Sequence, residues 1–243
     1  MRPCRWQWVR VVLRPWADRV MTSIVLAGGA SSRLGFGKAL EVLNGKSLVQ
    51  WVVERLAVLS REIIVVASGR DCPDELRGAL DPGLGLQLAA VRCPKSVAVK
   101  MVVDIYPSVG ALVGIYSGLA ASSASRAIVV GCDMPFLNAG LLGYMVELSS
   151  AFDVVVPRTA KGVEPLCAVY SKSCLGSINS LLQRNELRIG ELLNMVKVRY
   201  VDEDEIAKFD REHLSFFNIN TRAELAKARK LAVGRGWQHT ASD

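Results

Sequence analysis

The segment SIVLAGGASSRLGFGKAL, residues 23–40, joins a short apolar run to a glycine-rich turn. The run, residues 24–26, predicts a buried strand. Gly28 and Gly29 follow it directly and let the backbone turn tightly, with no Cβ to keep a ligand away from the main chain. Because successive backbone N–H groups in such a turn form a concave anion site, the segment predicts an anion-binding loop at the end of a strand.

Two cations follow in the same loop. Arg33 carries a planar guanidinium that matches phosphate oxygens, and Lys38 carries a compact ammonium. Together with the glycine turn they predict a polyphosphate site. Glycine pairs also occur in ordinary turns, and loop arginines and lysines are usually solvated. The spacing alone therefore does not distinguish a phosphate site from an ordinary turn.

The composition of the 243 residues is that of a globular protein, with 51% hydrophobic and 22% charged residues. No apolar run approaches the ~20 residues that a membrane-spanning helix needs, so we expect a soluble, cytoplasmic protein without membrane contact. The six cysteines form no C-x-x-C pair, which indicates reduced thiols. Residues 1–20 contribute +4 of the net charge of +7, and the mildly basic remainder of +3 suits an enzyme that handles anionic nucleotides. No basic helix with interleaved aromatic residues indicates a nucleic-acid partner.

Strand and helix patterns alternate along the chain, so we expect one domain over residues 21–232. Its fold class is α/β, with three α/β/α layers around a mainly parallel sheet. Residues 1–20 carry five arginines against one aspartate and do not fit this pattern. We interpret them as a mis-called start, with Met21 as the initiator, or as a disordered extension. Residues 233–243 are expected to form a flexible tail.

The periodicity predicts the individual elements. Ser47 is expected to cap a helix over 48–56, and Thr221 with Glu224 to form a capping box before the last helix. The expected strands are 24–26, 62–68, 86–91, 126–130, 153–157, 163–170 and 196–201. The expected helices are 48–56, 74–80, 115–121, 139–149, 172–185, 190–195 and 223–232.

A second candidate site residue follows a buried strand. The strand over 126–130 ends in GCDMPFL, residues 131–137, so Asp133 lies at its carboxyl end. Ligands bind at this edge of parallel sheets. Mg²⁺ typically takes one or two carboxylates plus substrate phosphates, so Asp133 is a candidate metal ligand. An aspartate before a proline turn is also a common turn residue.

The pattern L-A-G-G-x-S-x-R-x-G-x-x-K-A, residues 26–39, resembles the signature of nucleotidyltransferases that join an NTP to a phosphorylated acceptor. Within them it is most similar to the molybdenum cofactor guanylyltransferase (MobA-like) family. DIYPSVGALVGI, residues 104–115, and CDMPFL resemble two further passages of that family. The resemblance covers residues 21–232. Three departures stand out: Gly37 where many relatives have Asp, Ser108 for a Gly and Ala111 for a Pro.

The resemblance implies a Rossmann-like nucleotidyltransferase fold. It implies transfer of GMP from GTP to Mo-molybdopterin with Mg²⁺ as cofactor, and release of the guanine dinucleotide form and pyrophosphate. Transient contact with molybdenum-cofactor biosynthesis and insertion proteins is also implied.

Residue roles carry over from the resemblance position by position. Catalytic roles fall on Lys38, Arg33 and Asp133, with Asp133 as the metal ligand. On the acceptor side stand Arg158, Glu164 and Asn220; Lys161 is either an acceptor contact or a solvated loop charge. The implied nucleotide-binding residues are Leu26, Ala27, Gly28, Gly29, Lys38, Asp104 and Asp133.

Three alternatives stay open. The same first loop serves a sister enzyme that uses CTP, and one that loads another phosphorylated acceptor such as a sugar phosphate. A non-catalytic adaptor that binds nucleotide or cofactor is a different class. Such an adaptor would be expected to have lost Lys38 or Asp133. Both residues are present, which argues against it.

Overall fold

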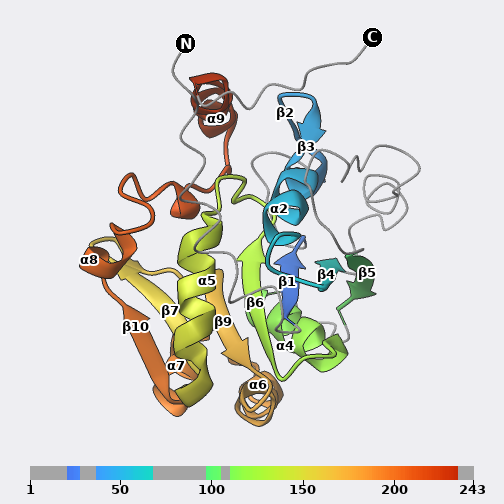
Figure 1. Cartoon of the computed structure of the whole chain (residues 1–243). Coiled ribbons are helices and arrows are strands. Elements are labelled where there is room, and N and C mark those ends of the chain that lie inside the picture. The colour runs from blue at the N-terminus through green and yellow to red at the C-terminus, as the bar shows by residue number, and fades with distance from the viewer. Residues whose placement is uncertain (1–20, 28–36, 68–96, 105–109, 235–243) are drawn as a thin grey trace.

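The computed structural model of the chain describes residues 21–27, 37–67, 97–104 and 110–234 (Figure 1). The expected helix at 74–80 and strand at 86–91 lie outside these residues, as do both ends of the chain, 1–20 and 235–243.

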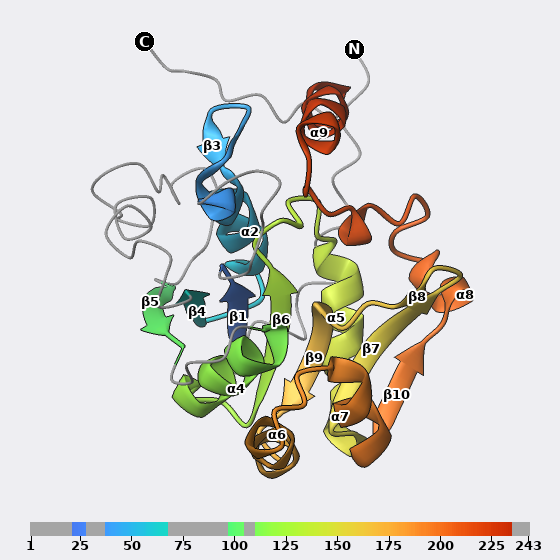
Figure 2. The same cartoon turned by 180° about the vertical axis from the view of Figure 1, so that it is seen from behind.

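A mainly parallel sheet forms the middle of the fold, in the strand order β10-β7-β9-β6-β1-β4-β5 (Figures 1 and 2). β1 pairs in parallel with β4 and β6, as do β4 with β5 and β10 with β7. β9 runs antiparallel to β6 and β7, and the short β8 runs antiparallel to β7. The strands are β1 (Thr22–Leu26), β4 (Glu62–Ala67), β5 (Ala98–Val103), β6 (Arg126–Gly131), β7 (Val154–Thr159), β8 (Gly162–Val163), β9 (Cys167–Ser171) and β10 (Val198–Val201).

Helices cover both faces of the sheet, which confirms the three expected layers (Figures 1 and 2). α2 (Leu48–Leu56) and α5 (Ala139–Leu148) lie on one face. α4 (Ala111–Ala121), α6 (Cys174–Gln183) and α7 (Ile189–Met195) lie on the other. In β1, Val25 packs toward the first face, whereas Ile24 and Leu26 pack toward the second, as strand alternation requires. None of the helices in the described ranges is long and apolar enough to cross a membrane.

A third hydrophobic cluster packs the last described helix against a segment from the first quarter of the chain. It packs α9 (Arg222–Gly234) and Ile219 against the β2–β3 hairpin (Val42–Leu43 and Lys46–Ser47) and the start of α2. The cluster therefore brings the residues before α9 beside the residues before α2. Its buried members are Leu43, Leu48, Trp51, Phe136, Ile219, Leu225, Ala228 and Ala232. The remaining short elements are η1 (Lys38–Leu40), η3 (Ser149–Ala151), α8 (Glu203–Ile206) and η4 (Leu214–Phe216).

Several element boundaries differ from the prediction. Residues 98–103 had no assigned element and form β5, at the edge of the described sheet, where Lys100 interrupts the apolar residues and the side chains are exposed or half-exposed. The strand expected at 163–170 is divided into β8 and β9 by a turn in which the Cys167 N–H donates to the Glu164 carbonyl at 3.0 Å. Pro165 lies in this turn and has no N–H to donate to a sheet. The Ser47 cap is confirmed, with Gln50 completing a capping box.

Gly118 lets α4 lie close against β1. A Cβ added at this position would come within 2.5 Å of Cγ2 of Ile24, a fully buried side chain. The core offers Ile24 no space to move aside, because interiors are close-packed. Gly176, on α6, gives a matched contrast, since an added Cβ there would meet nothing within 4 Å.

We therefore expect opposite effects from the same substitution at two helical glycines. Gly118→Ala should lower the free energy of unfolding by about 1–3 kcal/mol through overpacking. Gly176→Ala should raise it by up to about 1 kcal/mol, because alanine favours the helix. Urea unfolding measures both. Equal responses of the two variants would contradict the close approach of α4 to β1.

Glu62 ties three strands together at the amino end of the sheet. It is buried in β4 and accepts hydrogen bonds from Thr22 Oγ of β1 at 2.6 Å, from Lys100 Nζ of β5 at 2.7 Å, and from the N–H and hydroxyl of Ser123. Burial alone would raise the pKa of the Glu62 carboxyl. The hydrogen bonds from Lys100, Thr22 and Ser123 outweigh burial and lower that pKa to about 2.

This lowered pKa predicts a pH-dependent contribution to stability. Because the folded pKa lies below the ordinary value of 4.5, the ionised carboxylate stabilises the fold above that pH and loses its effect as pH falls toward about 2. Glu62→Gln should lower the free energy of unfolding at pH 7 by about 1–3 kcal/mol, and the difference from wild type should shrink on acidification. The exposed Glu147→Gln is the control. A difference that stays constant from pH 7 to pH 3 would refute this role.

Candidate active site

The carboxyl ends of β1, β4 and β6 meet at one edge of the sheet because the three strands are parallel. The chain leaving β1 stays bonded to both neighbours: the Ala27 N–H donates to the Val66 carbonyl at 2.8 Å, and the Cys132 N–H donates to the Leu26 carbonyl at 3.1 Å. Leu26 and Ala27 therefore lie directly beside the segment that carries Asp133. Of the predicted loop residues, Gly28, Gly29 and Arg33 lie outside the described residues.

Lys38 connects two residues that are far away in the sequence. Its Nζ donates to Oδ2 of Asp133 at 2.5 Å and to Oδ1 of Asn220 at 2.5 Å. The side chains of Lys38 and Asp133 are only 14% and 17% exposed, so the ion pair is shielded from much of the solvent. The structure thus brings together three predicted site residues from η1, the end of β6 and the segment before α9.

The backbone places the Lys38 side chain at the start of η1. Gly37 precedes it with a φ of 101°, in the left-handed region that favours glycine. This geometry gives a physical reason for Gly37 at a position where many relatives of the resembled family have Asp. Lys38 is thus the first residue of a short helical turn whose Ala39 is buried in the core.

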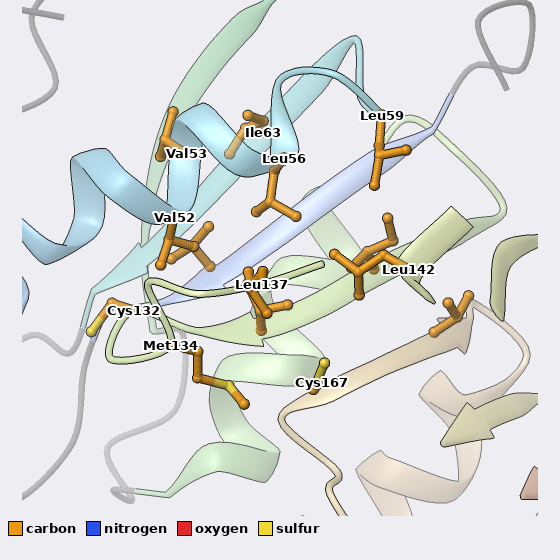
Figure 3. Close-up of a cluster of buried hydrophobic side chains, with 14 of the residues drawn as sticks. Val52, Val53, Leu56, Leu59, Ile63, Cys132, Met134, Leu137, Leu142 and Cys167 are labelled. Carbon is orange, nitrogen blue, oxygen red and sulfur yellow. The ribbon is translucent and has the colours of Figure 1, made fainter. Parts of the chain in front are cut away.

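Asp133 is held by the buried residues on both sides of it. Cys132 and Met134 are buried members of the cluster that α2 and α5 form with the sheet, and they lie at its border (Figure 3). A Cβ added at Gly131 would overlap with Oδ1 of Asp133, so the carboxylate folds back over the end of β6. The Asp133 carbonyl accepts the Ile219 N–H at 3.0 Å, which fixes the segment before α9 beside it.

Asp104 lies on the α4 side of the same edge. It directly follows β5, and its N–H donates to the Ala67 carbonyl at the end of β4 at 3.0 Å. Its Oδ1 is 3.8 Å from the position that a Cβ on Gly114 would take, and Cδ2 of Leu26 is 3.0 Å from that position. The half-buried carboxylate of Asp104 therefore lies close to the end of β1.

The predicted acceptor residues have different surroundings. Arg158 is half exposed and pairs with Asp202, at 2.9 Å from Nε to Oδ1, while its guanidinium lies 4.8 Å from the Tyr200 ring centre. Glu164 is half-buried, and its N–H donates to the Pro157 carbonyl at 3.0 Å. Burial raises the pKa of the Glu164 carboxyl, and the charge of Lys161 opposes this rise. Only Asn220 of this set contacts Lys38.

The site places the Lys38 ammonium between the carboxylate of Asp133 and the amide oxygen of Asn220. Within the described ranges no group of three or more His, Cys, Asp or Glu side chains lies close enough to hold a metal by itself. Mg²⁺ needs fewer protein ligands when phosphates supply the others. The Asp133 and Asn220 oxygens both face one cation, the Lys38 ammonium. The same oxygens could face a metal ion whose remaining ligands come from the phosphates of a bound compound.

One residue at this site had only a local explanation in the sequence. Glu224 was expected to complete a capping box, and its carboxylate does bond Thr221. The same Oε2 also accepts the N–H of Asn220 at 2.8 Å. The sequence does place a glutamate four residues after Asn220. The expected capping box already explained this glutamate, so there was no reason in the sequence to expect a bond to Asn220.

Comparison with known proteins gives a consistent result. The MobA-like NTP transferase domain model matches residues 23–197. A probable molybdenum cofactor guanylyltransferase from Pelotomaculum thermopropionicum is 34% identical over 220 residues, which cover 89% of this chain and 97% of the relative. A molybdenum cofactor guanylyltransferase from Desulfosudis oleivorans is 33% identical over 210 residues, covering 86% and 94%. The crystal structure of molybdopterin-guanine dinucleotide biosynthesis protein A from Archaeoglobus fulgidus has a TM-score of 0.66 and 27% identity, covering 88% of this chain and 100% of that chain.

The packing of Gly131 predicts the effect of a single methyl group. Gly131→Ala should displace the Asp133 carboxylate from the end of β6, away from the position in which it could hold a metal. Misplacing a charged ligand costs at least as much as losing a charge-assisted hydrogen bond, about 1.5–3 kcal/mol, so we expect Mn²⁺–nucleotide affinity to fall about tenfold or more, measured by electron paramagnetic resonance. Gly190→Ala is the control, because an added Cβ there meets nothing within 4 Å. Unchanged affinity in a folded Gly131→Ala variant would show that the Asp133 position is unimportant for binding.

Proposed function

This chain belongs to the MobA-like NTP transferase family, and from that premise we propose that it is a molybdenum cofactor guanylyltransferase. It transfers GMP from GTP to Mo-molybdopterin and releases pyrophosphate. The observation that carries the proposal is the convergence of Lys38, Asp133 and Asn220 at the carboxyl edge of the sheet.

We propose that the enzyme works in the cytoplasm on these two small-molecule substrates. The three cysteines in the described residues are buried and form no disulfide, as expected in a reducing compartment.

The reaction needs positioning and charge neutralisation rather than a covalent enzyme intermediate. An oxygen of the acceptor's terminal phosphate attacks the α-phosphorus of GTP. A new P–O bond forms, the bond from the α-phosphorus to the bridging oxygen breaks, and pyrophosphate leaves with that electron pair. The protein's task is to hold two polyanions in line and to offset their charge.

Lys38 is the main cation that we assign to this task. In the structure its ammonium is shared between Asp133 and Asn220. An ammonium is a compact donor on a flexible stem, so Lys38 can turn from these oxygens toward phosphate oxygens of the nucleotide. Arg33 would add a second cation from the same loop, and the backbone of Gly28 and Gly29 would surround the phosphates.

Asp133 and Asn220 fit Mg²⁺ because both present oxygen atoms toward one cationic position. Asp133 would be the metal ligand. When bound with the nucleotide, Mg²⁺ would neutralise negative charge on the phosphates. The buried neighbours of Asp133 keep its carboxylate in place without a metal, since the core holds Cys132 and Met134.

We assign the nucleoside of GTP to the carboxyl edge of the sheet, on the face that α4 covers. Leu26 and Ala27 offer backbone groups at the end of β1, and Asp104 places a carboxylate beside Leu26. We assign Glu164 and Arg158 to the anionic acceptor. Arg158 would have to leave Asp202, which costs little, because exposed ion pairs contribute only about 0–1 kcal/mol.

The proposal predicts selective binding of GTP. Calorimetry of the full chain with Mg²⁺ should show tighter binding of GTP than of CTP, and Asp133→Ala should weaken GTP binding about tenfold or more and abolish turnover. Asp204→Ala, at an exposed carboxylate of α8, is the control.

Each other outcome has a definite meaning. A preference for CTP would make the protein a cytidylyltransferase. Binding without turnover on the molybdenum cofactor would favour another acceptor or an adaptor. Absence of binding of either nucleotide would refute the function, and full activity of Asp133→Ala would refute the metal role.

A further inference from the structure

Three of the helices that the structure describes begin with a similar side-chain arrangement. In α2, Gln50 Oε1 accepts the N–H of Ser47, the capping residue itself, at 2.8 Å. In α8, Glu205 Oε2 accepts the N–H of the capping residue Asp202 at 3.3 Å. Both are ordinary capping boxes, in which the third helical residue bonds the backbone of the cap.

The arrangement at α9 is displaced by one residue toward the active site. Thr221 Oγ accepts the Glu224 N–H at 3.2 Å, as a capping residue does. Glu224 Oε2 then bonds the hydroxyl of Thr221 at 3.0 Å and the N–H of Asn220 at 2.8 Å. Asn220 precedes the cap and is the residue whose side chain contacts Lys38. A plain helix cap does not require this second bond.

The segment of Ile219 and Asn220 is therefore held from three sides. The Ile219 N–H bonds the Asp133 carbonyl, and the Ile219 side chain is fully buried in the third cluster. Glu224 fixes the backbone of Asn220. The exposed Asn220 side chain would otherwise keep its rotational freedom, and ordering it costs free energy. The backbone position from which the Asn220 side chain reaches Lys38 is thus held in part by Glu224.

We propose that Glu224 is a positioning residue for guanylyl transfer, acting through Asn220 to hold Lys38 and Asp133 in their working arrangement. The inference rests on the proposed function. The hydrogen bond from the Asn220 N–H lowers the pKa of the Glu224 carboxyl.

Three variants test the proposal against a purely structural cap. Glu224→Ala removes both bonds, Glu224→Gln keeps one oxygen acceptor, and Gln50→Ala removes the corresponding box of α2. We expect Glu224→Ala and Gln50→Ala to lower the melting temperature similarly. Only Glu224→Ala should lower kcat/KM for GTP, about fivefold to tenfold, as expected for about 1 kcal/mol or more of lost positioning. Glu224→Gln should restore part of it.

A double-mutant cycle tests the route through Asn220. In an Asn220→Ala background, Glu224→Ala should cause no further loss of kcat/KM, because coupled residues are not additive. Full additivity of the two losses would overturn the proposal, as would unchanged kinetics of Glu224→Ala at a lowered melting temperature.

A second readout separates this proposal from the proposed function. The side-chain amide NMR signal of Asn220, assigned by its loss in Asn220→Ala, should move to the position of a disordered chain in Glu224→Ala and stay unchanged in Gln50→Ala. If wild type fails to use GTP but this signal moves as expected, the positioning stands and the substrate assignment fails. An unmoved signal refutes the positioning whatever the substrate.

Discussion

The parallel hydrogen bonding of β1 between β4 and β6 is the physical basis of the site. Leu26 is aligned with Val66 on one side and with Gly131 on the other. Side chains of all three strands are buried on both faces of the sheet, so a slip of one residue would exchange their faces and is strongly disfavoured. This register fixes where the chain leaves each strand, and therefore where Ala27 and Cys132 begin the loops of the active site.

Three different kinds of support then hold the polar residues. The core holds Asp133 through the buried Cys132 and Met134. A left-handed glycine and a short helical turn hold Lys38. A displaced helix cap holds Asn220. The first support is stiff because it belongs to the packed interior, whereas the third depends on exposed hydrogen bonds. A substrate that reorganises the site is expected to move Lys38 and Asn220 more easily than Asp133.

Much of this could be predicted from local patterns. Apolar runs gave the buried strands β1, β4 and β6, and helical spacing with Ser47 as cap gave α2. The prediction was wrong or incomplete where tertiary packing overrides local preference. β5 is a half-exposed strand at the edge of the described sheet, with Lys100 interrupting its apolar residues, and the turn at Pro165 divides one expected strand into two. The contacts of Lys38 with Asp133 and Asn220 are observed, but the roles of these and of all other site residues stay predictions.

The amino-acid sequence alone was sufficient for the α/β class, the strand ends that carry candidate residues, and the chemistry that Lys38 and Asp133 offer, because these follow from neighbours within a few positions. It contained no local signal that Lys38 bonds Asp133 and Asn220, which lie 95 and 182 positions away. Packing of α9 against the β2–β3 hairpin and α2 brings these segments together. The contact of Glu224 with Asn220 has a wider setting only in the folded chain, because the fold places Asn220 beside Lys38 and Asp133.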